Sequence, residues 1–312
     1  MIRALALLLL VLAALSLFIG DATLALPDSR IFWQLRLPRT LLGALVGGGL
    51  GLSGAVLQGA LRNPLADPGL LGITGTAGLG AVIAFYWGLA MEFPPALLLG
   101  GLAGAGIGAG FLLAFAGRAP SGPSLILAGV AVSAIASALL ALALALAPNP
   151  FALTEITFWL MGGLADRPMW QVELAAPVIA LGGAILLKLG PGLDALSLGE
   201  ETARSLGVPV AATLRMAAIG TACAAGAGTA VAGSIGFIGL VVPHLLRPWL
   251  GERPAALLPA APLAGAALLL AADMLVRLAP LVLPLSADPP VGVLTALLGA
   301  PFLVAIARRS AP

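Results

Sequence analysis

The sequence predicts an all-α, polytopic membrane protein with about ten transmembrane helices, and three observations support this fold class. The 312 residues are 61% hydrophobic and only 9% charged, whereas about 25% of the residues in soluble domains are charged. The apolar residues form successive runs of about 20, the length of an α-helix that crosses a bilayer. Many of the 41 glycines lie within these runs, where they allow helices to pack closely. Runs of this length favour helices over a β-barrel.

The first apolar run, at 3–20, follows a single basic residue, Arg3. A cleaved signal peptide begins in the same way. We interpret the run as the first membrane helix, because it is long for a signal peptide and residues 21–26 hold no clear small-x-small cleavage site. The borders between the later runs carry the Pro, Gly and Asn residues that are typical of turns. The remaining spans are expected at 40–61, 69–90, 96–116, 124–147, 170–189, 210–232, 235–250, 255–278 and 290–307.

Basic residues indicate how these spans are oriented. With both termini in the cytoplasm, ten of the 15 basic residues fall at the cytoplasmic ends of the spans, as the positive-inside rule requires. These ten are Arg3, Arg62, Arg118, Lys188, Arg204, Arg215, Arg247, Arg253, Arg308 and Arg309. The other five lie at the outer ends and need a separate explanation: Arg30, Arg36, Arg39, Arg167 and Arg277.

The sequence carries no pattern that indicates catalysis. It has no GxxxxGK[ST] loop for nucleotide phosphates. The single histidine, His244, lacks the neighbours of a metal site, so we expect a structural, hydrogen-bonded role for it. Cys223 is interpreted as a small core residue. No row of intramembrane carboxylates suggests proton-driven transport. We therefore expect a chain that is not an enzyme and binds no cofactor, with ATP and Mg²⁺ held by a separate partner ATPase.

One short stretch, Leu196–Pro209, interrupts the apolar pattern with charged residues. Glu200 and Arg204 are four residues apart, a spacing that pairs side chains on a helix. Leu198, Ala203, Leu206 and Val208 are expected to form an apolar side. The stretch is too short and polar to span a bilayer. Such a helix can seat in a groove on a soluble partner, or lie on the lipid surface.

The spacing E-x-A-x-x-x-G at 201–207 resembles the cytoplasmic loop by which ABC importer permeases engage their ATPases. Other blocks extend the resemblance from about residue 30 to the C-terminus, in an order and spacing similar to the permeases of type II ABC importers for iron-siderophores, haem and vitamin B12. The blocks are RLPRT at 36–40, SGAVLQG at 53–59, RNPLADPGLLG at 62–72, LILAGV at 125–130, FWLMGG at 158–163, LGEETARSLGV at 198–208, GFIGLVVPHLLR at 236–247 and PVGVLTALLGAPF at 290–302.

The resemblance implies a single transmembrane permease domain over residues 1–312, with a cytoplasmic coupling segment at about 191–209. It implies a bacterial inner-membrane location and a homodimer with the pathway at its two-fold axis. Two ATP-binding cassette ATPases would dock below, and a periplasmic binding protein above. The chain would be surrounded by lipid and contact no nucleic acid.

The resemblance also implies roles for particular residues. The residues implied to contact the ATPase are Leu198, Gly199, Glu200, Glu201, Ala203, Arg204, Leu206 and Gly207. The residues implied to dock the binding protein are Arg36, Arg39 and Arg277. Asp273 is expected to pair with Arg277 at i,i+4. The alternative is that these arginines reach outer headgroups or pack locally. The gate and pathway fall on Asn63, Leu65, Gly122, Pro123 and Leu127. Gly122 and Pro123 stand where some relatives have hydroxyl residues, which leaves backbone and shape to close the pore. Trp159, Met161 and Gly162 match a short segment over the pore mouth; the alternative for Trp159 is an interfacial anchor.

We therefore expect the permease subunit of an ATP-driven importer that passes a bulky metal chelate to the cytoplasm by alternating access. An iron-siderophore complex is the main expectation, because it is the broadest substrate class of the family. Vitamin B12 or haem are the alternatives. A secondary transporter driven by an ion gradient is a more distant alternative, and an enzyme acting within the membrane is a third class.

Overall fold

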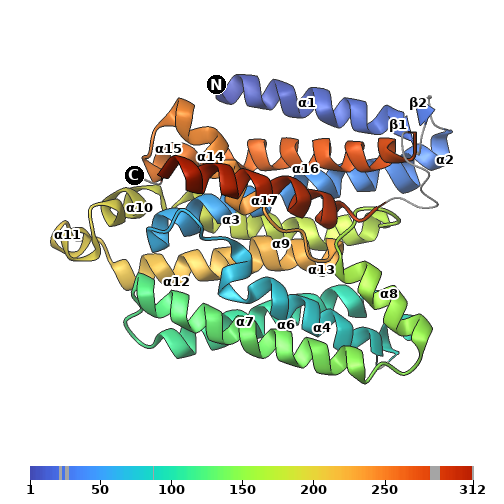
Figure 1. Cartoon of the computed structure of the whole chain (residues 1–312), viewed down its shortest axis with the longest axis horizontal. Helices are drawn as coiled ribbons and strands as arrows, with labels where there is room; N and C mark the ends of the chain where they lie inside the picture. Colours follow the sequence, from blue (N-terminus) through green and yellow to red (C-terminus); the bar gives the residue numbers. More distant parts are fainter. Residues whose placement is uncertain (21–22, 25–27, 87, 282–288, 311–312) are drawn as a thin grey trace.

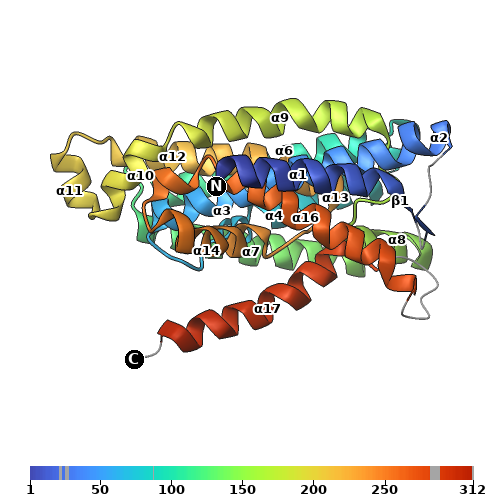
Figure 2. The ribbon, with the colours of Figure 1, turned by 90° about the horizontal axis from the view of Figure 1, so that it is seen from above.

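The computed structural model describes residues 1–20, 23–24, 28–86, 88–281 and 289–310. Its long helices run roughly parallel to one axis and form one elongated bundle, from which α17 diverges toward its C-terminal end (Figures 1 and 2). The longer helices are α1 (Ile2–Phe18), α3 (Leu37–Leu61), α4 (Ile73–Tyr86), α6 (Ala96–Ala116), α7 (Gly122–Ala145), α8 (Pro150–Leu160), α9 (Met169–Leu187), α12 (Val210–Thr221), α14 (Ile238–Leu250), α16 (Ala261–Leu278) and α17 (Val291–Ser310).

Shorter elements connect these helices. Two strands of two residues each pair antiparallel, with Ile19 opposite Leu24. Two π-helical turns continue into α-helices, one before α3 and one between α12 and α13. The shorter elements are β1 (Ile19–Gly20), β2 (Thr23–Leu24), α2 (Ser29–Ile31), η1 (Phe32–Arg36), η2 (Pro68–Leu71), α5 (Leu89–Glu92), α10 (Gly190–Ser197), α11 (Glu200–Ser205), η3 (Ala222–Gly226), α13 (Ala227–Ala232), α15 (Pro254–Leu257) and η4 (Ala279–Leu281).

Ten apolar helical stretches coincide with the ten predicted spans. Six are long and apolar enough to cross a membrane: Ser29–Leu61, Ala96–Ala116, Gly122–Ala145, Met169–Leu187, Val210–Ala232 and Ala261–Leu281. Four are shorter: Ile2–Phe18, Ile73–Tyr86, Ile238–Leu250 and Val291–Phe302. The described part of the chain is therefore an all-α membrane protein, apart from the small hairpin.

Helix α3 forms the centre of the bundle. It contacts α16, α14, α9 and α12, and 83% of its most apolar window is buried. Glycines allow these contacts: a Cβ atom at Gly47 would strike the backbone carbonyl of Gly265 in α16, and one at Gly54 would strike the carbonyl of Gly239 in α14. The prediction that glycines serve close helix packing is confirmed here.

The N-terminal helix α1 is part of this bundle. It packs along α16 and touches α3. At its end, the buried Ser16 hydroxyl forms a 2.8 Å hydrogen bond with the Thr40 hydroxyl of α3. The structure therefore gives the first apolar run the packing of a membrane helix of the bundle.

Three local features differ from the expected boundaries. Residues 196–209 do not form one helix: α10 ends at Ser197 and α11 begins at Glu200, because Gly199 adopts φ +111° between them. Helix α14 begins at Ile238 instead of 235, because Phe237 is left-handed, with φ +68°. Helix α8 was not expected, although Asn149 caps it by accepting a hydrogen bond from Ala152 N–H at 2.9 Å and Pro150 occupies its first turn.

Candidate coupling and docking sites

The charged residues gather at the two ends of the bundle. We call these the α11 end, which holds α10 and α11, and the hairpin end, which holds β1 and β2 (Figure 1). Contacts place Arg62, Arg118, Arg204, Arg215, Arg247 and Arg253 at the α11 end, and Arg36, Arg39, Arg167 and Arg277 at the hairpin end. This separation agrees with the two groups predicted from the sequence. Arg308 and Arg309 lie in a part of α17 whose side chains are not described.

The predicted coupling segment is a helix–break–helix. Helix α10 begins at Gly190, with Pro191 in its first turn. Gly199 then breaks the helix. Gly207, with φ +81°, ends the second helix in a backbone conformation that L-residues rarely adopt. Gly207 therefore marks a sharp turn between α11 and α12.

The four residues predicted to form the apolar side of this segment do not share one environment. Ala203 is fully buried and Val208 is half-buried. Leu198 and Leu206 are instead 64% and 62% exposed. We call these two leucines and the exposed Glu201 the α11 surface.

Acidic side chains attach the coupling segment to the bundle. Glu200 accepts a hydrogen bond from Arg204 at 3.1 Å, which confirms the predicted i,i+4 pair. Its other oxygen accepts from the Gly122 backbone N–H at 2.7 Å. Asp194 of α10 accepts from Arg253 and from Ala255 N–H, both at 2.9 Å. These tertiary contacts were not predicted.

The two parts of the predicted gate lie next to each other. Gly122 begins α7, and a Cβ atom placed on it would lie 3.8 Å from Leu61 Cα, at the end of α3. Beyond Leu61, the Asn63 side chain accepts a hydrogen bond from Leu65 N–H at 2.9 Å and fixes the turn. Leu65 is 55% exposed.

The start of α7 presents other predicted gate residues to the surface. Pro123 is exposed, and Leu127, one turn further along, is 72% exposed. These side chains leave an apolar surface on α7 near the α11 end.

Asp67 stabilises the loop between α3 and α4. Its carboxylate accepts a hydrogen bond from Gly69 N–H at 2.9 Å, which caps the turn η2. Burial raises the pKa of this carboxyl above its ordinary value, and the hydrogen bond from Gly69 opposes the rise. The loop is thus held by a carboxylate that the sequence analysis did not single out.

Gln58 and Arg247 form a further link that the sequence did not reveal. Gln58 donates to the Leu240 carbonyl at 3.2 Å and accepts from Arg247 at 2.7 Å, so it joins α3 to α14. One turn away, His244 Nδ1 lies 3.0 Å from the Leu240 carbonyl, which fits the structural role predicted for this histidine. Among the described residues, no three His, Cys, Asp or Glu side chains gather as a metal site would require.

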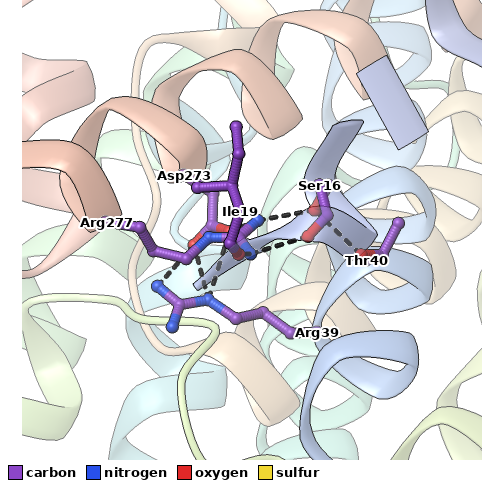
Figure 3. A network of polar contacts seen from close by, with 6 residues as sticks. All are labelled: Ser16, Ile19, Arg39, Thr40, Asp273 and Arg277. Atoms are coloured by element: carbon purple, nitrogen blue, oxygen red, sulfur yellow. Dashed lines mark hydrogen bonds and ion pairs between the residues drawn. The ribbon is translucent and has the colours of Figure 1, made fainter. Parts of the chain in front are cut away.

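A buried ionic network occupies the hairpin end (Figure 3). Asp273 of α16 accepts from Arg39 of α3, with contacts of 3.0 and 3.1 Å, and from Arg277 at 2.9 Å. Arg277 also donates to the Ser16 and Ile19 carbonyls at 2.8 Å, and to the Ser16 hydroxyl. The predicted Asp273–Arg277 pair is confirmed, and it joins α1, α3 and α16.

This network corrects the expectation for one docking arginine. Arg277 is only 2% exposed, because the end of α1 covers it. A direct contact between Arg277 and a docked protein does not fit this structure. The alternative of local packing describes Arg277 better.

Arg36 and Arg39 lie nearer the surface. Arg36 is half-buried and donates to the Leu17 and Phe18 carbonyls at 2.9 and 3.1 Å. The Arg39 side chain is 12% exposed and reaches the wall of a cavity of about 310 Å³, which Trp159 and Arg167 also line. Burial lowers the pKa of Arg167, and the charge of Asp166 opposes that effect.

The segment Trp159–Gly162 lies beside α17. The Gly162 carbonyl accepts from Gly292 N–H at 3.2 Å, which fixes the start of α17. A cavity of about 520 Å³ opens between Met161, Ser234 and the first turns of α17. The segment therefore borders a cavity beside the start of α17.

Comparisons with known proteins cover nearly the whole chain. The FecCD transport family matches residues 5–309. The vitamin B12 import system permease protein BtuC of Citrobacter koseri is 41% identical, over 99% of this chain and 94% of that protein. The BtuC protein of Salmonella paratyphi A is 42% identical, over 98% and 94%. A solved structure described as an inward-facing conformation of a metal-chelate type ABC transporter has a TM-score of 0.87 and 34% identity, covering 98% of both chains.

Proposed function

Because the chain belongs to the FecCD transport family and is an ABC importer permease of the metal-chelate and vitamin B12 type, we propose that its substrate is vitamin B12. The observation that carries this proposal is the identity of 41% and 42% to two vitamin B12 permeases along almost the entire chain. Vitamin B12 was the alternative in the sequence analysis. It replaces the iron-siderophore complex that was the main expectation.

In the proposed mechanism, two copies of the chain enclose a pathway in the bacterial inner membrane. A periplasmic binding protein delivers the substrate at the hairpin end, and two ATPases bind at the α11 end, with both termini of the chain in the cytoplasm. ATP and Mg²⁺ belong to those partners. Closure of the ATPases moves the coupling segments and exposes the pathway alternately to each side.

The α11 surface supports the assignment of the ATPase site. It offers Leu198 and Leu206 as apolar anchors, with Glu201 beside them, on a segment that ends in the fixed turn at Gly207. Exposed leucines that flank a short helix suit a groove on a soluble partner. Ala203 is assigned to packing within the permease, because it is buried.

Arg36 supports the assignment of the binding-protein site. Its carbonyl contacts hold the side chain across the end of α1 at the hairpin end. A guanidinium held there offers positive charge to acidic groups of a docking protein. Arg39 is assigned to the same site; its side chain lines a cavity and pairs with Asp273.

The test is purification followed by transport. The affinity-tagged chain, extracted in mild detergent from its native cells, should retain an ATPase subunit. The reconstituted complex, supplied with the cognate binding protein, should take up radiolabelled vitamin B12 only with ATP. A ferric siderophore in place of vitamin B12 is the substrate control. Uptake of the siderophore without vitamin B12 uptake would contradict the proposed substrate, and uptake without an ATPase would contradict the transporter class.

A double variant, Glu201→Ala with Gly207→Ala, tests the α11 surface in the same assay. The first change removes an exposed charge, and the second strains a turn with φ +81°. Uptake and substrate-stimulated ATP hydrolysis should both fall, while the variant still elutes as a folded protein. Normal uptake by this variant would refute the assigned ATPase site.

A further inference from the structure

Helix α7 begins with a nearly complete set of local hydrogen bonds. A helix leaves four backbone N–H groups without partners inside the helix at its start. Here Ser124 N–H donates to the Ser121 hydroxyl at 3.3 Å, and Ser121 N–H donates to the Ser124 hydroxyl at 2.9 Å, a reciprocal capping box. Pro123 has no N–H. One donor of the four remains, the N–H of Gly122.

Glu200 of α11 supplies the partner for this last donor. Its carboxylate accepts the Gly122 N–H at 2.7 Å, across 78 positions in the chain. The carboxylate is negative and lies at the positive end of the α7 helix dipole, so charge strengthens the hydrogen bond. The Glu200 side chain is 19% exposed, in contrast to the exposed Glu201 beside it. Glu200 thus joins the coupling segment to the gate helix.

A second contact holds the same end of α7, and it comes from α12, the helix that follows the coupling segment in the chain. Arg215 of α12 donates to the Arg118 carbonyl at 2.6 Å, in the loop that leads into α7. Helix α10, before the break at Gly199, is attached elsewhere: Asp194 binds Arg253 and the start of α15. A movement of α11 relative to α10 would therefore displace the start of α7 and leave α15 in place.

Helix α7 is also the least buried of the six long spans. Only 28% of its most apolar window is buried, the lowest value among the six long spans, against 83% for the stretch that contains α3. A helix that its own chain covers so little shifts at lower cost than one in the centre of the bundle. The end that Glu200 holds carries Gly122 and Pro123, and Leu127 follows one turn later.

We propose that Glu200 is a positioning residue that transmits the movement of α11 to the start of α7. This inference rests on the proposed function, because the partner ATPase drives α11. Glu200 therefore acts inside the permease rather than in contact with the ATPase, and Leu198, Glu201 and Leu206 provide the docking contact. The N-terminus of α7 then moves with α11 and changes its contact with Leu61 at the end of α3.

Distance measurements between spin labels test this transmission without any substrate. In a Cys223→Ser background, labels at Ser205→Cys and Leu181→Cys report on α11 relative to α9, and labels at Ala131→Cys and Leu181→Cys report on α7 relative to α9. With the ATPase bound, ATP should change both distances. Glu200→Ala should preserve the α11 change and abolish the α7 change. An α7 change as large as in the parent would overturn the proposal.

Transport assays and matched variants complete the test. Glu200→Ala should still bind the ATPase and hydrolyse ATP, while vitamin B12 uptake per ATP falls about ten-fold or more, since a hydrogen bond to a charged group is lost. Glu200→Gln keeps an acceptor oxygen, so its vitamin B12 uptake per ATP should lie between that of the parent and that of Glu200→Ala. Glu252→Ala, which removes an 83% exposed carboxylate at the same end, should match the parent. Loss of ATPase binding in Glu200→Ala would place Glu200 in docking and overturn the proposal. If the parent itself binds no ATPase, the proposed function fails instead.

Discussion

The hairpin end holds a buried network in which charged side chains share partners, whereas several charged side chains of the α11 end are exposed to the surroundings. Asp273 is fully buried and accepts from two arginines, and Arg277 reaches three groups at the end of α1. At the α11 end, the side chains of Arg204, Arg253 and Glu252 are 56%, 81% and 83% exposed. The buried network and these exposed side chains use the same kinds of residue in opposite environments.

The contrast separates charges that hold the bundle together from charges that can change partners. A buried ion that loses its partner has no water to replace it, so breaking a buried pair costs about 3–5 kcal/mol. An exposed pair is worth about 0–1 kcal/mol, because water solvates both groups after separation. The hairpin end is therefore fixed, and the α11 end can rearrange at little cost. This is the asymmetry that a mechanism driven from the α11 end needs.

The largest effect is expected from Asp273→Ala. It leaves Arg39 and Arg277 without their shared carboxylate and should lower the free energy of unfolding by about 3–5 kcal/mol. Thermal unfolding of the detergent-solubilised protein measures this loss. Asp273→Asn keeps acceptor and donor atoms in place and should lose less. A melting temperature within 1 °C of the parent for Asp273→Ala, about the scatter expected of a surface change, would remove the distinction between the ends.

An intermediate effect is expected for docking of the binding protein. Arg36→Glu reverses a charge held at the surface of the hairpin end. It should lower the affinity for the binding protein about ten-fold, which corresponds to about 1.4 kcal/mol. Surface plasmon resonance on the reconstituted complex measures the affinity. Arg36 is a better choice than Arg39, because a glutamate at 39 would face Asp273 and disturb the fold.

Two comparisons make the docking test specific. Arg30→Glu reverses an exposed charge in α2 at the same end and serves as the matched control. A general effect of charge would weaken binding equally in both variants, which would argue against a specific site at Arg36. Reversal of an acidic residue on the binding protein should partly restore binding to Arg36→Glu only.

The spans were predictable because each is set by its own residues. A run of about 20 apolar residues must become a helix in a bilayer, whatever its neighbours do. Turn signals then placed the ends within a few residues for most of the helices. Helix α8 was missed because Pro148-Asn149-Pro150 was interpreted only as a turn, although Asn followed by Pro is also the start signal of a helix.

The site was predictable only where contacts are local in sequence. Glu200–Arg204 and Asp273–Arg277 followed from i,i+4 spacing, and both pairs are present. The Arg39–Asp273 contact spans 234 positions and Glu200–Gly122 spans 78, so both depend on how helices pack. For the same reason the sequence could not show that the end of α1 covers Arg277.

The smallest effect, expected from Arg204→Ala, completes the comparison of the two ends. Arg204 is 56% exposed and contacts Glu200 within one short helix, a pair worth about 0.3–0.5 kcal/mol. The melting temperature should fall by at most about 2 °C. The bond from Glu200 to Gly122 uses the other carboxylate oxygen, so the α7 movement reported by spin labels should persist. A large loss of stability in Arg204→Ala would mean that the α11 end is held as firmly as the hairpin end, and a rearranging coupling segment would then be untenable.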